Sequence, residues 1–211
     1  MIGIFGGTFD PIHFGHLRPL LEVREALRLS EVRFIPCYIP PHRAAPGATP
    51  AQRLAMLQLA LNETPGCFID ERELQRGGPS YMVDTLQSLR DELGDMPLVF
   101  ILGMDAFCKL DRWHQWPRLI ELAHIVVMLR PDSAMPSGAV AELVAAHQVK
   151  ESCELAQSAA GGVWFQSVTQ LDIAATAIRE RVAQGRDIRF LVPESVRHYI
   201  ETHGLYQLQT Q

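Results

Sequence analysis

Near its start the chain carries the stretch Gly6-Gly7-Thr8-Phe9-Asp10-Pro11-Ile12-His13-Phe14-Gly15-His16. The apolar run before it, residues 2–5, is short enough for one buried strand, and residues 17–27 have apolar side chains at helical spacing. We therefore expect a strand, a tight turn and a helix N-terminus to meet here. Glycine lets the backbone approach a ligand closely, and unpaired N–H groups at a helix N-terminus favour anions. The stretch thus predicts a phosphate-binding site.

Two histidines of this stretch, His13 and His16, flank Gly15 and bring two imidazoles to the expected, exposed strand–helix junction. In a transfer between phosphates, a phosphate of one substrate attacks a phosphorus of the other, and a phosphate group leaves. The attacking phosphate is largely a dianion at neutral pH, so the reaction needs positioned cationic donors more than a strong base. Imidazole N–H groups near phosphates suit this role. The alternative is a glycine-rich connection with two solvated histidines.

Residues 6–11, followed by His13-x-Gly15-His16, resemble the signature of the nucleotidyltransferase superfamily that carries an H-x-G-H motif. The resemblance implies that His13 and His16 are catalytic and that the turn contacts ATP. The candidate ATP-binding residues of this stretch are Gly6, Gly7, Thr8, Phe9, Gly15 and His16.

The composition fits one domain: 211 residues, 47% of them hydrophobic and 20% charged. Nineteen Lys and Arg against 24 Asp and Glu give a net charge of −5, so neither nucleic acid nor a membrane is an expected partner. No apolar run reaches the roughly 20 residues of a membrane span, and the N-terminus does not resemble a signal peptide. The four cysteines form no C-x-x-C pair, which favours a cytoplasmic protein without disulfides or a zinc site.

Strand-like and helix-like segments alternate along the chain, which predicts an α/β fold with a doubly wound parallel sheet. The resemblance implies the Rossmann-like nucleotidyltransferase fold, in a single domain over residues 1–211 with a small C-terminal helical segment at about 172–206. The expected strands are 2–5, 32–37, 67–70, 98–102, 124–129 and, more weakly, 163–165. The expected helices are 17–27, one that starts at Thr49-Pro50, 80–93, 176–183 and 193–202. Residues 131–162 are expected to be peripheral.

A second phosphate element lies near the C-terminus, in Leu171-Asp172-Ile173-Ala174-Ala175-Thr176-Ala177-Ile178-Arg179. It predicts another helix N-terminus, where the Thr176 hydroxyl and the Arg179 guanidinium suit phosphate oxygens. The stretch resembles the I-S-S-T-x-I-R element of the same superfamily. The resemblance implies that Ile173, Thr176 and Arg179 grip the triphosphate of ATP, with Arg179 as a catalytic residue. Two alanines stand where serines are usual, so backbone contacts remain and serine hydroxyl contacts are lost.

Two further segments follow expected strands. In Pro40-Pro41-His42-Arg43 the prolines stiffen a loop, and His42 and Arg43 add two donors for an anion; a rigid surface loop is the alternative. Gly103 and Asp105 follow the strand at 98–102. The Asp105 carboxylate can accept hydrogen bonds from ribose hydroxyls, or it can cap the next helix.

Two segments bear on the acceptor. Pro79-Ser80-Tyr81 opens an expected helix, whose free N–H groups can hold a carboxylate. Trp113-His114-x-Trp116 supplies aromatic surface for stacking a heterocycle; such residues often belong to the core, but polar neighbours favour partial exposure of Trp113. The candidate acceptor-binding residues are His42, Arg43, Ser80, Tyr81, Met82, Thr85, Trp113 and His114.

In this order, and with D-E-R-E-L at residues 70–74, the motifs resemble those of bacterial nicotinate mononucleotide adenylyltransferases, from residue 2 to about residue 206. The resemblance implies adenylyl transfer from ATP to nicotinate mononucleotide, giving deamido-NAD and pyrophosphate in NAD biosynthesis. Mg²⁺ would accompany ATP, with no metal bound by the chain alone, and the protein would be a monomer or a small homo-oligomer. Met82 stands where threonine is frequent near the nicotinate carboxylate, so recognition depends more on backbone N–H groups.

Two alternatives remain open. The first is an adenylyltransferase that acts on nicotinamide mononucleotide or phosphopantetheine, although the phosphopantetheine family usually has threonine in place of His13 and a shorter chain. The second is a nucleotide-sensing module without turnover, in which the histidines would be expected to change first; both are present.

Overall fold

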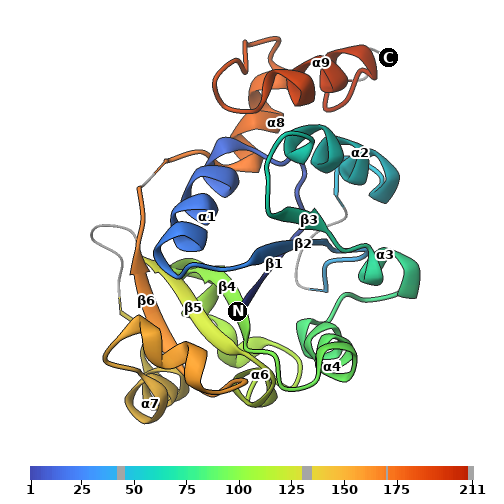
Figure 1. Ribbon diagram of the computed structural model, residues 1–211. Helices are drawn as coiled ribbons and strands as arrows, with labels where there is room; N and C mark the ends of the chain where they lie inside the picture. Colours follow the sequence, from blue (N-terminus) through green and yellow to red (C-terminus); the bar gives the residue numbers. More distant parts are fainter. Residues whose placement is uncertain (42–45, 130–134, 170, 209–211) are drawn as a thin grey trace.

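A computed structural model describes residues 1–41, 46–129, 135–169 and 171–208 (Figure 1). Six strands form one sheet in the order β3-β2-β1-β4-β5-β6, and every neighbouring pair is parallel. The strands are β1 (Ile2–Gly7), β2 (Glu31–Pro36), β3 (Cys67–Ile69), β4 (Leu98–Gly103), β5 (His124–Leu129) and β6 (Val163–Ser167). The predicted parallel α/β sheet is therefore confirmed.

Helices cover both faces of the sheet (Figure 1). On one face, α1 (Phe14–Ala26) and α2 (Pro50–Leu61) share a core with the sheet. Buried residues of α8 (Ala175–Ala183) and α9 (Glu194–Thr202) extend this core, and α9 packs against α2. The other face packs against α4 (Met82–Leu93), α5 (Met104–Phe107), α6 (Arg118–Leu122) and α7 (Gly138–His147). The short helix α3 (Arg72–Arg76) follows β3, and two 3₁₀ turns span Leu110–Arg112 and Ser152–Gln157. No helix of the described residues is long and apolar enough to cross a membrane.

The continuous apolar runs of the central strands follow from this two-sided packing. On β4, Val99 and Ile101 join the core on the α1 face, whereas Phe100 and Leu102 join the core on the α4 face. Because neighbouring side chains of a strand point to opposite faces, a strand buried on both faces has no polar position. This explains why the sequence pattern located the strands well.

Local capping explains where some helices begin. Thr49 accepts a hydrogen bond from the backbone N–H of Gln52 and forms a capping box with it, and Pro50 is the first helical residue, as predicted. The sequence did not predict α3, α6 or α7, nor the bounds of α5. In α7, Val140 and Val144 are buried against the α4-face core, so part of the segment expected to be peripheral closes the core.

The order of the strands locates the ligand-binding edge. The chain builds β1, β2 and β3 outward on one side and then returns to add β4, β5 and β6 on the other side. Sheets of this kind bind ligands beyond the carboxyl ends of the strands, at the point where the order reverses. That point lies between β1 and β4, which end at Gly7 and Gly103, so the first motif lies at the reversal.

Candidate active site

The two histidines of the first motif lie directly against each other at the start of α1. Their ring centroids are 3.7 Å apart, and their planes are inclined by 27°. His13 precedes α1 with extended backbone and is only 3% exposed. His16 is partly exposed and meets the ring of Phe9 edge-on, at 5.5 Å between centroids. The pair forms as expected, but His13 is buried and does not lie at an exposed turn.

Gly15 brings the second phosphate element next to the first. A Cβ on Gly15 would lie 2.8 Å from the backbone oxygen of Ile173 and 2.9 Å from Nδ1 of His13. Side-chain carbons do not approach other atoms so closely, so glycine is needed where the chain at Ile173 passes α1. Helix α8 begins two residues later, at Ala175, with Ala174 as its N-cap and no side-chain cap. The N-terminal ends of α1 and α8 therefore meet beside the histidines.

The glycine-rich turn after β1 is tightly packed. A Cβ on Gly6 would overlap Cε of Met82, and one on Gly7 would lie 2.7 Å from the ring of Phe9. Phe9 has a positive φ of 48° and is buried as a whole residue, so its contact with ATP stays a prediction. Thr8 is partly exposed. The turn thus links the predicted ATP-binding residues to Met82, at the start of α4.

A hollow of about 30 Å³ lies between the start of α1 and the carboxyl ends of β4 and β5. It is lined by Gly15, Pro19, Gly103, Met128, Val168, Thr169 and Leu171. Two predicted site residues, Gly15 and Gly103, therefore share one hollow although they come from different elements. Asp105 is exposed on the first turn of α5. The N-cap of α5 is Gly103, with no side-chain cap, so Asp105 does not cap the helix, and its contact with a ribose stays a prediction.

Arg179 of α8 reaches back to the first motif. Its Nη1 donates a hydrogen bond to the backbone oxygen of Asp10 at 2.7 Å, and its Nη2 lies 3.4 Å from the Thr176 hydroxyl. The side chain of Arg179 is 32% exposed. The guanidinium predicted to bind phosphate is therefore held beside the turn that leads to His13.

Arg53, which the sequence analysis did not select, ties two strand ends together. It is fully buried and donates hydrogen bonds to the backbone oxygens of Thr8, at 2.8 Å, and Tyr38, at 3.1 Å. Arginine is rarely buried unless it is paired. One feature of the sequence did indicate that Arg53 is buried: it lies on the same face of the α2 helix as the apolar residues Met56 and Leu57.

The start of α4 is fastened to the segment after β2. The backbone N–H of Ser80 donates to the oxygen of Ile39 at 3.0 Å, and the Ser80 hydroxyl accepts from the N–H of Tyr38 at 2.8 Å. Ser80 therefore positions the segment through bonds within the chain. Tyr81 is the N-cap, without a side-chain cap, and Met82 begins the helix. We keep Tyr81 and Met82 as the candidates for holding an acceptor carboxylate.

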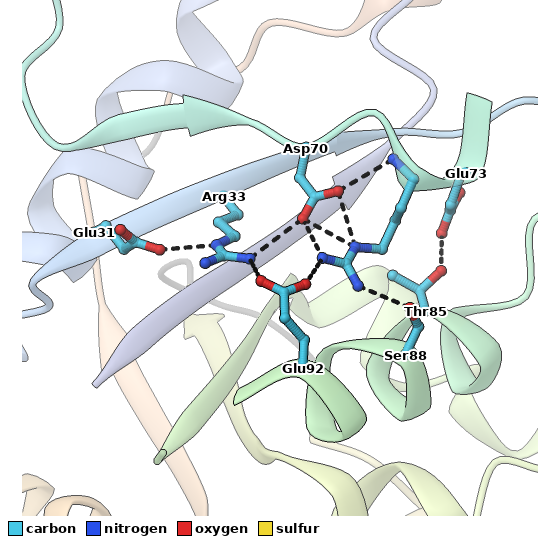
Figure 2. A network of polar contacts seen from close by, with 8 residues as sticks. Glu31, Arg33, Asp70, Glu73, Thr85, Ser88 and Glu92 are labelled. Carbon is cyan, nitrogen blue, oxygen red and sulfur yellow. Dashed lines mark hydrogen bonds and ion pairs between the residues drawn. The ribbon is translucent and has the colours of Figure 1, made fainter. Parts of the chain in front are cut away.

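Thr85, predicted to reach the acceptor, faces inward. It is fully buried, and its hydroxyl donates to the carboxylate of Glu73 at 2.5 Å (Figure 2). Burial raises the pKa of Glu73. Arg76 lies 3.3 Å from the same hydroxyl. Because no surface of Thr85 is open to a ligand, the side chain supports α4 from α3 instead of touching the acceptor.

The predicted aromatic surface lies beside Tyr81. The rings of Tyr81 and His114 are 4.5 Å apart between centroids and inclined by 38°. Trp113 is partly exposed and packs at 6.0 Å from the ring of Phe100. The structure thus brings His114 and Tyr81 together. Trp113 packs against the core with one part of its ring and is exposed to solvent with the rest.

The segment 70–74 makes an ion-pair network with β2 and α4 (Figure 2). Arg72 contacts Asp70 and Glu92, each at 2.7 Å, and Arg33 contacts the same carboxylates at 3.5 and 3.1 Å. Although burial opposes the charge, hydrogen bonds from Arg72 hold the pKa of Asp70 below its usual range. A depression of about 500 Å³ lies over this network. Its arginines are paired with carboxylates, so we assign the network a structural role.

His42 and Arg43 lie outside the described residues, and their roles stay predictions.

Comparison with known proteins identifies the family of this chain. Residues 4–181 match the model of the cytidylyltransferase-like family. A protein of Methylococcus capsulatus named "Probable nicotinate-nucleotide adenylyltransferase" is 52% identical over 208 residues, which cover 98% of this chain and 99% of that one. A protein of Aeromonas salmonicida with the same name is 49% identical, over 98% and 97% of the two chains. The chain therefore belongs to the cytidylyltransferase-like family and, within it, to the nicotinate-nucleotide adenylyltransferases.

The fold is also found in solved structures. Plasmodium falciparum nicotinic acid mononucleotide adenylyltransferase, complexed with NaAD, superposes with a TM-score of 0.74 at 16% identity, over 97% of this chain and 96% of that one. The same enzyme complexed with APC gives a TM-score of 0.71. The predicted nucleotidyltransferase fold is confirmed.

Proposed function

We propose that the protein transfers the adenylyl group of ATP to nicotinate mononucleotide, producing deamido-NAD and pyrophosphate for NAD biosynthesis. The observation that carries this proposal is the meeting of the stacked His13–His16 pair with the N-terminal ends of α1 and α8 at the sheet reversal. Phosphate oxygens are attracted to helix N-termini, and two such ends suit a reaction that brings two phosphates together. The relatives that align over nearly the whole chain carry the name of this activity.

The phosphate of the acceptor is the nucleophile. It attacks the α-phosphorus of ATP, the bond from that phosphorus to the bridging oxygen breaks, and pyrophosphate leaves with the electron pair. His13 and His16 donate hydrogen bonds to phosphoryl oxygens, which offsets the charge that gathers there. Thr176, Arg179 and the start of α8 bind the phosphates that leave. Each of these groups stabilises negative charge on the phosphates, and none has to remove a proton.

The two halves of the dinucleotide lie on different elements. Gly103 and Asp105 hold the adenosine, where β4 ends. Tyr81 and Met82 receive the carboxylate of nicotinate at the start of α4, and His114 and Trp113 flank its ring. Met82 touches the first glycine turn, so the two halves meet where the phosphates must react.

Mg²⁺ accompanies ATP in this proposal. In the described part of the chain, no three His, Cys, Asp or Glu side chains gather into a group that could hold a metal ion. Mg²⁺ commonly binds through substrate phosphates and keeps several waters, so the residues present suit a cation carried on the triphosphate. When bound, the cation neutralises phosphate charge.

None of the four cysteines forms a disulfide, which supports a cytoplasmic enzyme. A monomer or a small homo-oligomer stays a prediction. A second acceptor, nicotinamide mononucleotide, would use the same adenylyl chemistry, and phosphopantetheine would lack the pyridine ring that His114 and Trp113 flank. The test is pyrophosphate release from ATP and Mg²⁺ with each acceptor in turn. We expect release with nicotinate mononucleotide; release only with phosphopantetheine, or none, would overturn the proposal.

A further inference from the structure

Asp10 collects hydrogen bonds from three distant segments. The residue is 4% exposed. Its Oδ1 accepts from the Tyr206 hydroxyl at 2.8 Å and from the N–H of Ala48 at 3.1 Å, and its Oδ2 accepts from the N–H of Gly47 at 2.8 Å. The carboxylate therefore joins the first motif to the segment before α2 and to the C-terminal end of the described chain.

Arg179 forms only a long ion pair with this carboxylate. Its Nη1 donates to the backbone oxygen of Asp10 at 2.7 Å, while the distance from Nη1 to Oδ2 is 3.6 Å. A guanidinium and a carboxylate that are free to turn form much shorter, charge-assisted bonds. Three neutral donors already hold the two oxygens of Asp10, so the short bond of Arg179 goes to a neutral carbonyl and its pairing with the carboxylate stays long.

Tyr206 is held in an uncommon conformation to make its bond. Its φ is +63°, in the left-handed region that residues with a side chain rarely adopt. A Cβ on Gly47 would lie 3.1 Å from the Tyr206 ring and 3.5 Å from Cδ of Arg179, so the ring packs closely against this glycine. Burial and the adjacent carboxylate raise the pKa of Tyr206, so the hydroxyl keeps its proton and donates it.

We propose that Tyr206 is a positioning residue, whose hydroxyl keeps the Asp10 carboxylate turned away from Arg179 so that Arg179 can bind the phosphates of ATP. The inference rests on the proposed function, since it assigns Arg179 to ATP. Without the hydroxyl, Oδ1 of Asp10 loses a donor in buried surroundings, and the carboxylate turns toward the guanidinium that is already 3.6 Å from Oδ2. ATP must then compete with a carboxylate for Arg179.

The test compares Tyr206→Phe with Tyr199→Phe as its matched control. Tyr199 lies on α9 in the same C-terminal part, and its ring stacks on His203 at 3.9 Å instead of reaching the site. Calorimetric titration with Mg–ATP alone gives the Kd for ATP, and steady-state kinetics give KM for each substrate. We expect Tyr206→Phe to weaken ATP binding by about tenfold, the loss typical of one hydrogen bond to a charged group, with KM for the acceptor unchanged. Tyr199→Phe should match the wild type.

A double variant distinguishes two causes of weaker ATP binding: an ion pair between Asp10 and Arg179, and a general loss of order in the fold. In Tyr206→Phe with Asp10→Asn, residue 10 has no charge with which to capture Arg179, so ATP affinity should recover most of its loss. Wild-type ATP affinity in Tyr206→Phe, equal weakening of both substrates, or no recovery in the double variant would each overturn the inference. Failure of the wild type to use nicotinate mononucleotide would instead overturn the proposed function, because ATP binding is measured without an acceptor.

Discussion

The backbone oxygen of Ile173 lies so close to Gly15 that a Cβ there would be 2.8 Å from it. One phosphate element thus rests directly on the other, although the two are more than 150 residues apart in the chain. This contact fixes the start of α8 relative to the histidines. It is the geometric basis for a reaction that must hold acceptor phosphate and triphosphate together.

Gly15→Ala should therefore lower turnover strongly. The new methyl group has to displace the backbone at Ile173, and a shift near 1 Å in a site of this kind can cost about a hundredfold in rate. The measurement is kcat together with the melting temperature. Gly94→Ala is the control, because Gly94 has open space around it at the far end of α4, and its positive φ (+56°) strains an alanine there without any contact with the site. That control should lower the melting temperature and leave kcat unchanged; equal kcat losses would contradict the role of the contact.

His16→Ala should abolish most turnover while the fold remains, because it removes a donor to the phosphoryl group. Loss of one such donor typically costs about a hundred- to a thousandfold in kcat. Circular dichroism checks the fold. His13→Ala should also be inactive, but it should unfold at a lower temperature than His16→Ala, because His13 is 3% exposed and its removal leaves a buried gap. Wild-type turnover in folded His16→Ala would refute the assigned mechanism.

Arg179→Ala should weaken ATP and pyrophosphate more than the acceptor. The guanidinium lies on α8, against the backbone oxygen of Asp10, and away from the α4 elements that are assigned to nicotinate. Separate KM values for ATP, for nicotinate mononucleotide and, in the reverse direction, for pyrophosphate decide the matter. A defect confined to the acceptor would show that Arg179 serves the other half of the site.

His124 should make the protein less stable in acid. Its Nδ1 accepts from the N–H of Gly162 at 3.0 Å, so its Nε2 donates to the oxygen of Ser158 at 2.9 Å, and the buried ring is neutral. Burial lowers the pKa of His124. The unfolded chain therefore binds a proton that the folded chain does not, and stability is lost as pH falls below about 6.5.

Urea unfolding at several pH values between about 7.5 and 5 measures this loss of stability. His124→Gln, which has no titrating group, should show a shallower fall over the same range. Identical pH profiles for the variant and the wild type would exclude His124 as the cause.

The sheet could be predicted from sequence because its signals are local. The run at residues 124–129 and the Thr49–Pro50 cap each specify an element without help from distant residues. The contacts within the site that the sequence did not predict join residues far apart in the chain, and no local pattern indicates them. Tyr206 and Asp10 are 196 positions apart, and nothing in either segment indicates that they bond. Thr85 was misplaced for the same reason, since its partner Glu73 lies on a short helix that was not predicted.

The central claim is tested most directly by competition between the two pyridine mononucleotides. The protein is incubated with ATP, Mg²⁺ and equal amounts of the nicotinate and nicotinamide forms, and the dinucleotide products are separated by charge. An anionic carboxylate suits N–H groups at the positive end of α4, whereas the amide turns its own N–H₂ toward those donors; such pairing can discriminate by up to roughly 10⁴. We predict that deamido-NAD strongly predominates. Comparable yields of the two dinucleotides, or no dinucleotide at all, would contradict the account.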